Sequence, residues 1–450
     1  MKRSGMIAIL LAVSCLLFSC GKNGTVTEDP ADTSSEVVEE NFLSTDHEST
    51  DGMFKYSVYE DGTAKITSLL KTEENVTVPS SVDGHTVSVI GENCFDGNTE
   101  VRSIVFPDTV TRIDAYAMNG CSALEKVTLP SGLENISEGM FCDCEALGEI
   151  TLPKSLKTVG EGAFYRCNSL EKVSIPDGVE TVEGHAFSTC ASLKEVTVPD
   201  STVSVGSYAF SFCEKLETVT LGNGITKIGD YAFTQCDVLK EISLPDSLVS
   251  LDQGIFSNCA KLEKVRIGSN SAIASFGSGA FYCCTSLKDV FIPKNVTNID
   301  SYCFTSCESL TSVSVPDSVT YVGPYAFASC HSLKRVTLSS SLGEIPNYMF
   351  ASCENLSEIT VPSSCSIIGQ SAFLGCTSLS YVAIPEGVKE IGEQAFIGCS
   401  SMTKAKLPKS LESIGDDAFT DMGDGFTLVC PDGSFAHSFA QKYNYYFELQ

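Results

Sequence analysis

Cysteine is the residue type in this sequence with the greatest capacity for chemistry. The chain has 21 cysteines, and thirteen of them recur in one column of a repeat, three residues after a mostly aromatic position. These are Cys121, Cys144, Cys167, Cys190, Cys213, Cys236, Cys259, Cys284, Cys307, Cys330, Cys353, Cys376 and Cys399. So many cysteines usually indicate a disulfide scaffold or metal sites, but side chains in one column point in parallel, which is poor geometry for a disulfide. We therefore expect small, buried, unpaired thiols stacked along the fold.

A metal site would need a cluster of thiol, imidazole or carboxylate ligands. Cys283, Cys284, Cys303 and Cys307 fall in two consecutive repeats and could in principle hold Zn²⁺ tetrahedrally. Their spacing is not that of a Cys-x-x-Cys pair, and two of the four belong to the repeating column. The five histidines are scattered, and no two of them have the spacing of metal ligands. We predict no metal and no cofactor.

Catalytic motifs are missing from the sequence. It contains no His-Glu-x-x-His, no Gly-x-Ser-x-Gly elbow and no phosphate-binding glycine loop. Acidic residues are plentiful, but many recur directly after a proline, as at Asp108, Asp177 and Asp200, where they favour a solvated turn. A carboxylate pair for glycoside hydrolysis stays open as an alternative, since the sequence singles out no pair. The expectation is a protein that is not an enzyme.

The charge balance restricts the class of partner. Lys and Arg total 29 against 57 Asp and Glu, a formal net charge of −28. Nucleic-acid binding needs clustered Lys and Arg for phosphate contacts, and docking to anionic lipid needs the same. We therefore expect no nucleic-acid partner and no electrostatic membrane contact.

The first residues have the layout of an export signal. Lys2 and Arg3 precede an apolar run from Met6 to Phe18, which is shorter than the ~20 residues of a membrane-spanning helix. The segment Leu17-Phe18-Ser19-Cys20-Gly21 resembles the bacterial lipobox, which implies cleavage before Cys20 and a lipid on its thiol. Ordinary signal cleavage is the alternative. We assign residues 1–19 to a lipoprotein signal peptide and 20–50 to an acidic tether rich in Ser and Thr.

A 23-residue repeat fills most of the remaining chain. We call each repeat a rung and count positions from its aromatic residue, whose place Met118 takes in the second rung. Every step is 23 residues except the 25 residues from Phe256 to Phe281, which gives fifteen rungs. The aromatic residues are Phe95, Phe141, Phe164, Phe187, Phe210, Phe233, Phe256, Phe281, Phe304, Phe327, Phe350, Phe373, Phe396 and Phe419.

Each rung contains a strand pattern and a turn pattern. Leu at position +6 leads to alternating apolar residues at +9 and +11, as at Val173 and Ile175, which is typical of a strand with one buried face. A proline usually follows and ends the strand. Phe, Cys and Leu three residues apart suit a short helical turn with one buried side. Neither element buries its apolar side alone, so the rungs must stack.

These columns resemble the leucine-rich repeats of the BspA-like class. Residues 167–179, Cys-Asn-Ser-Leu-Glu-Lys-Val-Ser-Ile-Pro-Asp-Gly-Val, match its consensus L-x-x-I-x-I-P-x-S-V-x-x-I-G-x-x-A-F-x-x-C closely. The resemblance covers about residues 90–431. It implies an α/β repeat solenoid, right-handed, with a parallel β-sheet on the concave face and short helical turns on the convex side. It also implies a bacterial surface protein of a kind that acts in adhesion.

The solenoid needs a cap at each end. We assign residues 51–90 to an N-terminal β cap because Phe54–Tyr59 and Thr63–Ile66 flank a Glu-Asp-Gly turn. Residues 91–431 form the solenoid. Residues 432–450 form the C-terminal cap, with a short amphipathic helix from Ser434 to Tyr443 and a closing strand from Tyr445 to Leu449.

Candidate ligand-binding residues are the departures from the outward strand columns, because arginine and aromatic residues dominate binding hot spots. Position +10 is mostly Ser or Thr and position +8 mostly charged, which on its own is typical of a solvated sheet. The predicted binding residues are Lys264, Arg266, Asp289, Phe291, Arg335 and Tyr381. A second set is the column of Tyr residues at position −2, which we interpret mainly as half-buried packing on the convex side.

The sequence thus predicts a lipid-anchored, extracytoplasmic, non-enzymatic repeat protein, attached to the membrane only through its N-terminus. Its solenoid would bind a protein or glycan macromolecule on a host or on other bacteria, as a surface adhesin. One alternative is a structural scaffold facing the periplasm or wall. Another is a carbohydrate-binding accessory protein, which exposed Tyr would suit, although the chain has no Trp.

Overall fold

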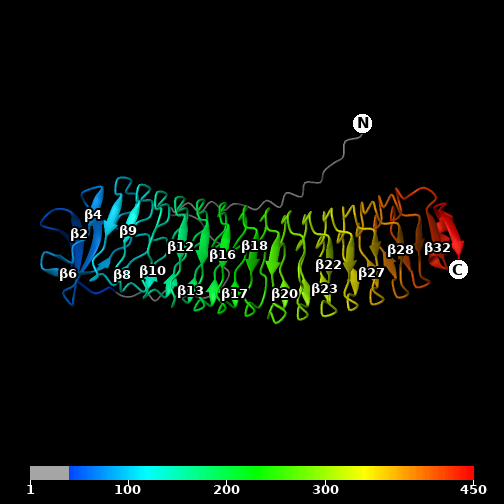
Figure 1. Cartoon of the computed structure of the whole chain (residues 1–450), viewed down its shortest axis with the longest axis horizontal. Coiled ribbons are helices and arrows are strands. Elements are labelled where there is room, and N and C mark those ends of the chain that lie inside the picture. The colour runs from blue at the N-terminus through cyan, green and yellow to red at the C-terminus, as the bar shows by residue number, and fades with distance from the viewer. Residues whose placement is uncertain (1–39) are drawn as a thin grey trace, which may run out of the picture. The chain divides into compact units, whose positions relative to one another are not determined.

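The computed structural model describes residues 40–450. The predicted signal peptide, the predicted lipidation site Cys20 and most of the predicted tether therefore lie outside the described residues. Residues 41–450 form one compact unit, an elongated stack of rungs with strands along two of its edges (Figure 1).

The first row of strands takes positions +8 to +10 of the rungs, as the sequence predicts. Neighbouring strands run parallel with a register of one rung, so that Val173 lies beside Val196. The outward face of this row is called the strand face below. Its members are β7 (Ser103–Val105), β9 (Lys126–Thr128), β12 (Lys172–Ser174), β14 (Glu195–Thr197), β16 (Thr218–Thr220), β18 (Glu241–Ser243), β19 (Lys264–Arg266), β22 (Ser312–Ser314), β24 (Arg335–Thr337), β26 (Glu358–Ile359), β28 (Tyr381–Ala383) and β30 (Lys404–Lys406).

A second row of two-residue strands runs along the opposite edge in Figure 1. These strands end on the apolar residue near position +18, and their ladders are also parallel, as between Val159 and Val182. They are β8 (Arg112–Ile113), β10 (Asn135–Ile136), β11 (Thr158–Val159), β13 (Thr181–Val182), β15 (Ser204–Val205), β17 (Lys227–Ile228), β20 (Ser275–Phe276), β21 (Asn298–Ile299), β23 (Tyr321–Val322), β25 (Glu344–Ile345), β27 (Ile367–Ile368), β29 (Glu390–Ile391) and β31 (Ser413–Ile414).

The expected short helical turns do not form, and this prediction was wrong. The segment around each aromatic residue is a series of turns with positive φ at positions −2 and +2, for example 58° at both Tyr208 and Phe212. Positive φ takes a residue out of the right-handed helix. The backbone groups bond between rungs instead, as where the N–H of Phe164 donates to the carbonyl oxygen of Ala186 over 2.8 Å. The spacing of three residues between the apolar Phe, Cys and Leu therefore belongs to turns that stack on one another, not to a helix.

The core is a continuous column of phenylalanine rings along the axis. From Phe141 to Phe419, consecutive rings stack with centroids 5.0–5.8 Å apart. All these side chains are buried. Stacking near the ~4.8 Å spacing of strands gives offset ring contacts and explains why one residue type occupies the column.

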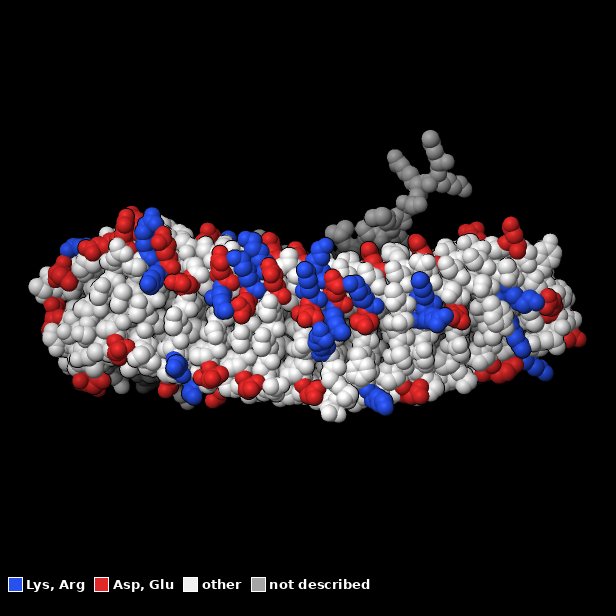
Figure 2. Space-filling view, in the orientation of Figure 1, with Lys and Arg blue, Asp and Glu red and all other residues white. Residues whose placement is uncertain are grey.

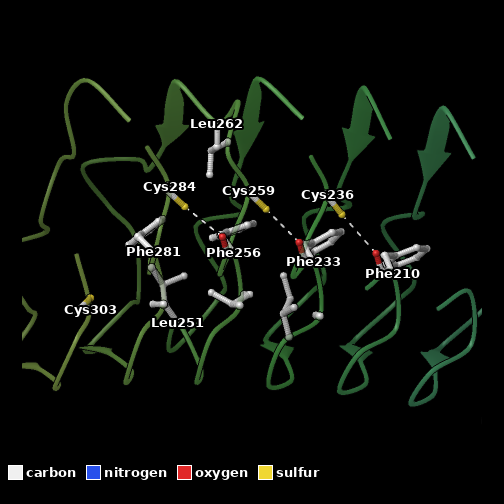
Figure 3. Packing of buried hydrophobic residues seen from close by; sticks show 14 of the residues in the cluster. Phe210, Phe233, Cys236, Leu251, Phe256, Cys259, Leu262, Phe281, Cys284 and Cys303 are labelled. Atoms are coloured by element: carbon white, nitrogen blue, oxygen red, sulfur yellow. Dashed lines mark hydrogen bonds between the residues drawn. The ribbon is translucent and has the colours of Figure 1, made fainter. Parts of the chain in front are cut away.

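The cysteine column lies beside the rings and is buried, as predicted. The thiols also have a role that the sequence reading missed. Each of the thirteen Sγ atoms donates a hydrogen bond of 3.1–3.3 Å to the backbone oxygen at the aromatic position of the preceding rung. Figure 3 shows three of these bonds, from Cys236, Cys259 and Cys284. The column therefore joins rungs as well as filling space.

The N-terminal end differs from the expected division in one respect. The hairpin of β2 (Phe54–Tyr59) and β3 (Ala64–Leu69) is confirmed. However, β1 (Phe42–Glu48) lies inside the range assigned to the tether and pairs antiparallel with β2. The ring of Phe42 stacks on Tyr59 with centroids 4.7 Å apart, so an otherwise polar segment has an apolar anchor that holds it on the cap.

Rung-like pairing begins within the predicted cap. There β4 (Asn75–Thr77) pairs with β7, and β6 (His85–Ile90) pairs with β8, both in parallel, while β5 (Ser81–Val82) pairs antiparallel with β6. At the other end the chain closes with β32 (Thr427–Cys430), α1 (Phe435–Lys442) and β33 (Tyr446–Leu449), close to the predicted strand, helix and strand. α1 is the one α-helix among residues 40–450.

Candidate functional site

The strand face presents the predicted binding residues. The +9 residue is buried in every strand of the row except β26, whose Ile359 is partly buried, while the residues at +8 and +10 are mostly exposed. Successive side chains of a strand point to opposite faces. All six predicted residues are exposed at these positions, namely Lys264, Arg266, Asp289, Phe291, Arg335 and Tyr381. They span five rung steps, or about 24 Å at a strand spacing of ~4.8 Å. The structure therefore places them in a linear array, with no single pocket holding all six.

Phe291 lies where the strand row is interrupted. Residues 289–291 form no strand, although they occupy the strand positions of their rung between β19 and β22. The two-residue insertion in the preceding rung also reduces the second row to a single bridge between Leu251 and Phe276. The Phe291 side chain is 47% exposed. A large apolar side chain therefore contacts water at a position where the strand row lacks a strand.

The two arginines of the set are held by carboxylates of neighbouring rungs. Arg266 pairs with Glu241 at 2.8 Å, and Arg335 pairs with Glu358 at 3.2 Å. All four side chains are at least half exposed. Exposed pairs of this kind contribute about 0–1 kcal/mol, so a partner with a better-placed carboxylate would displace either glutamate at little cost.

Charge on the middle part of the strand face follows an alternation, along and across the strands, that reading the sequence one column at a time missed. From the Phe164 rung to the Phe281 rung, positions +7 and +8 carry opposite charges, and the order reverses at each step. The residues are Glu171-Lys172, Lys194-Glu195, Glu217-Thr218, Lys240-Glu241, Glu263-Lys264 and Lys288-Asp289, with Thr218 the one exception. The alternation is visible in the sequence only when positions +7 and +8 are read together. Figure 2 shows basic and acidic side chains interleaved along this edge.

This alternation, called the charge checkerboard below, neutralises itself across rungs. Lys172 pairs with Glu195 at 2.9 Å, and Lys194 pairs with Glu171 at 2.8 Å. The side-chain hydrogen bond from Lys194 lowers the pKa of Glu171, and that from Lys288 lowers the pKa of Glu263. Cross-strand pairs of opposite charge stabilise a sheet. The checkerboard therefore contributes to the observed rung register and leaves little net charge for a partner.

Beyond the Phe281 rung the face changes character. Tyr381 is 46% exposed, and the residues opposite it and Ala383 on β30 are Lys404 and Lys406. Lys404 is bound to Glu448 of β33 at 2.9 Å. Aromatic rings and cations with few acids between them distinguish this part of the strand face from the checkerboard, and it is the better candidate for a binding surface.

The tyrosines at position −2 are half-buried, as predicted. They form ring stacks, with centroids 5.1 Å apart for Tyr208 and Tyr231 and 4.5 Å for Tyr325 and Tyr348. A Cβ atom on Gly254 would lie 2.2 Å from Cε1 of Tyr231, so this ring occupies the space that the glycine leaves. Because neighbouring rungs cover the ring faces, these tyrosines do not offer the flat surface that a sugar ring would stack on.

Other parts of the molecule offer little for chemistry. Residues 40–450 contain no group of three or more His, Cys, Asp or Glu arranged to hold a metal ion. A cavity of about 320 Å³ lies at the N-terminal end, lined by residues that include Leu69, Cys94, Asp96 and Glu100, and it contains none of the predicted site residues. In the described part of the chain, no helix has the length and apolar character needed to cross a bilayer.

Comparison with known proteins agrees with this architecture. A leucine-rich repeat protein from Bacteroides ovatus is 27% identical, with 88% of this chain and 98% of that chain covered and a TM-score of 0.70. A leucine rich cell surface protein from Faecalibacterium prausnitzii is 28% identical, with 83% and 97% covered and a TM-score of 0.50. No curated protein matches the chain.

The family comparison covers most of the solenoid. The model of the BspA type leucine rich repeat region (six copies) matches residues 74–194, 180–311 and 297–423. The match begins at β4, inside the range that we assigned to the N-terminal cap, which agrees with the parallel pairing of β4 and β7. The chain belongs to the BspA-type leucine-rich repeat family.

Proposed function

We propose that this protein is a non-enzymatic scaffold that binds a protein or glycan macromolecule of a host or of other bacteria through its strand face. The observation that carries the proposal is the array of Phe291, Arg335 and Tyr381. Each is two rungs from the next, which is about 10 Å, and both rings are nearly half exposed. Solenoids bind along such extended surfaces, and residues of these types contribute most of the energy in protein interfaces.

We further propose that the protein is attached to the cell surface by a lipid on Cys20. The lipobox-like segment that ends in Ser19-Cys20-Gly21 supports this. The printed description of the Faecalibacterium prausnitzii protein as a cell surface protein is a second support. In this arrangement the acidic segment before the cap would hold the strand face away from the membrane.

Protease shaving of intact cells tests the location. An antibody to the solenoid should show loss of the protein while an internal membrane-protein control survives, and Cys20→Ser should release the chain from the membrane fraction. Protection that ends only on envelope disruption would contradict the surface role and favour a scaffold that faces the periplasm or wall.

A binding screen against host and microbial proteins and glycans tests the surface itself. Phe291→Ala and Arg335→Ala should each weaken capture of any true ligand, whereas Lys126→Ala, on β9 at the far end of the same face, should not. A ligand whose capture is equal for all three variants does not use the proposed surface.

A further inference from the structure

Lys406 differs from the other cations of the strand face in its surroundings. Its cross-strand neighbours are Ala383 on β28 and Val429 on β32, neither of which is charged. The side chain is exposed. Among residues 40–450 no carboxylate lies within ion-pair distance of its ammonium group, whereas the adjacent Lys404 is held by Glu448.

Tyr381 lies diagonally across from this ammonium group. It is on the same strand as Ala383, two residues away, so both side chains point out of the same face. Ala383 stands in a column where most rungs carry Ser or Thr, and its methyl group leaves the ring without a polar neighbour at that position. A half-exposed ring, a methyl group and an unpaired ammonium group thus adjoin one another.

We propose that Tyr381, Ala383 and Lys406 form a docking site for an acidic protein segment, one that presents a carboxylate next to an apolar side chain. The carboxylate binds the Lys406 ammonium group in a charge-assisted hydrogen bond. The apolar side chain packs on the Tyr381 ring and the Ala383 methyl group. This inference rests on the proposed function and names the partner that one part of the strand face would bind.

The surroundings favour a protein segment over an acidic glycan. A bound sugar needs hydrogen-bond partners for its hydroxyl groups, because leaving them unpaired costs free energy. The column of Ser and Thr ends at Thr360, and the residues on either side of Lys406 in its column are Ala383 and Val429. The net charge of −28 also repels a long polyanion, so a short acidic segment with apolar side chains is the better match.

Fluorescence anisotropy on the full chain tests this, with a labelled random copolymer of Glu and Tyr of short chain length as the probe. Poly-glutamate and polygalacturonate of similar chain length serve as comparison probes. The copolymer should bind more tightly than either. Lys406→Gln and Tyr381→Ala should each weaken it about tenfold, the loss of one good contact, and Lys406→Arg should retain it. The matched control is Lys172→Gln, an exposed cation of the same face that already pairs with Glu195, which should bind as the parent does.

Several results would overturn the proposal. Equal binding of poly-glutamate and the copolymer, or no effect of Tyr381→Ala, would show charge attraction alone. A preference for polygalacturonate would assign the site to a glycan, and no binding of any probe would remove the site. The proposed function would survive each of these if the screen found a ligand whose capture depends on Phe291 and Arg335, so the two failures are distinguishable.

Discussion

The thiol of Cys190 donates a hydrogen bond to the backbone oxygen of Phe164, 3.2 Å away in the preceding rung. The same oxygen accepts the N–H of Cys167 from its own rung, also at 3.2 Å. One carbonyl group therefore joins a turn to its own rung and to the next. Because this hydrogen bond recurs along the axis, the thiol column connects each rung to the preceding one. Serine in place of cysteine would bury a hydroxyl group, which is more strongly hydrated than a thiol.

Removing one thiol should have a modest effect. Cys190→Ala loses the hydrogen bond and some buried volume, but the Phe164 oxygen keeps its other donor, so we expect a loss of about 1–2 kcal/mol in the free energy of unfolding. Denaturant unfolding followed by circular dichroism would measure it. The half-buried Cys283 lies outside the column, and Cys283→Ala should cost clearly less. Equal losses would contradict a structural role for the thiol bonds.

Stability should fall in alkaline solution. Burial raises the pKa of Cys213 and of Cys399 to about 12, and it raises the pKa of most other column thiols as well. Thiols of the unfolded chain ionise near pH 8.5, so the unfolded state releases protons that the folded state keeps. The stabilisation is therefore complete below about pH 8 and declines as pH rises toward 12.

The denaturation midpoint measured between pH 7 and pH 11 would show this decline. Lysine and tyrosine also ionise at the upper end of this range, so the control is a Cys213→Ala, Cys399→Ala double variant, which has two fewer titrating thiols. Its midpoint should fall less steeply with pH. Parallel curves for the parent and the double variant would show that the thiols are not the cause.

Two glycines with the same backbone conformation provide a matched pair of substitutions. Gly254 and Gly279 have φ of 59° and 62°, so alanine strains the backbone similarly at both. A Cβ atom on Gly254 meets the Tyr231 ring at 2.2 Å, whereas at Gly279 the nearest atom is Cβ of Tyr282 at 3.5 Å. Gly254→Ala should therefore destabilise the protein by about 1–3 kcal/mol more than Gly279→Ala. Thermal unfolding would compare them, and adding Tyr231→Ala to Gly254→Ala should remove most of the difference.

Charge reversal within the checkerboard should be mildly destabilising and sensitive to salt. Lys194→Glu places a third carboxylate beside Glu171 and Glu195, where the native ammonium group pairs with Glu171 at 2.8 Å. We expect a loss of about 0.5–1 kcal/mol at low ionic strength that shrinks at 1 M salt. Lys194→Gln should lose less. A loss that salt does not change would indicate packing of the lysine stem as the cause.

The strand positions could be predicted from the sequence because their apolar residues alternate, as at Val173 and Ile175, and this pattern has one buried face in only one register. The conformation of the turns could not be predicted from the sequence. Phe, Cys and Leu three residues apart fit a helix equally well, and the feature that excludes a helix is positive φ at residues such as Tyr208 and Phe212, where no glycine indicates it.

The candidate site was predicted in part. Rarity within a column identified Phe291 and Tyr381, and both are exposed. Two features depend on neighbouring rungs and could not be found from single columns. One is the pairing of Arg266 and Arg335 with carboxylates of adjacent rungs. The other is the alternation of charge between positions +7 and +8. The absence of a strand at 289–291 could not be predicted either, because residues 149–151 also form no strand although no insertion precedes them.

The two-residue insertion between Phe256 and Phe281 marks a junction in the stack of rungs. At this point both strand rows are interrupted, by the single Leu251–Phe276 bridge on one edge and by residues 289–291 on the other. The ring column nevertheless continues, with Phe256 and Phe281 5.6 Å apart, and so does the thiol bond from Cys284 to Phe256. The phenylalanine and cysteine columns therefore keep neighbouring rungs connected where the strand ladders do not, and Phe291 lies beside this junction.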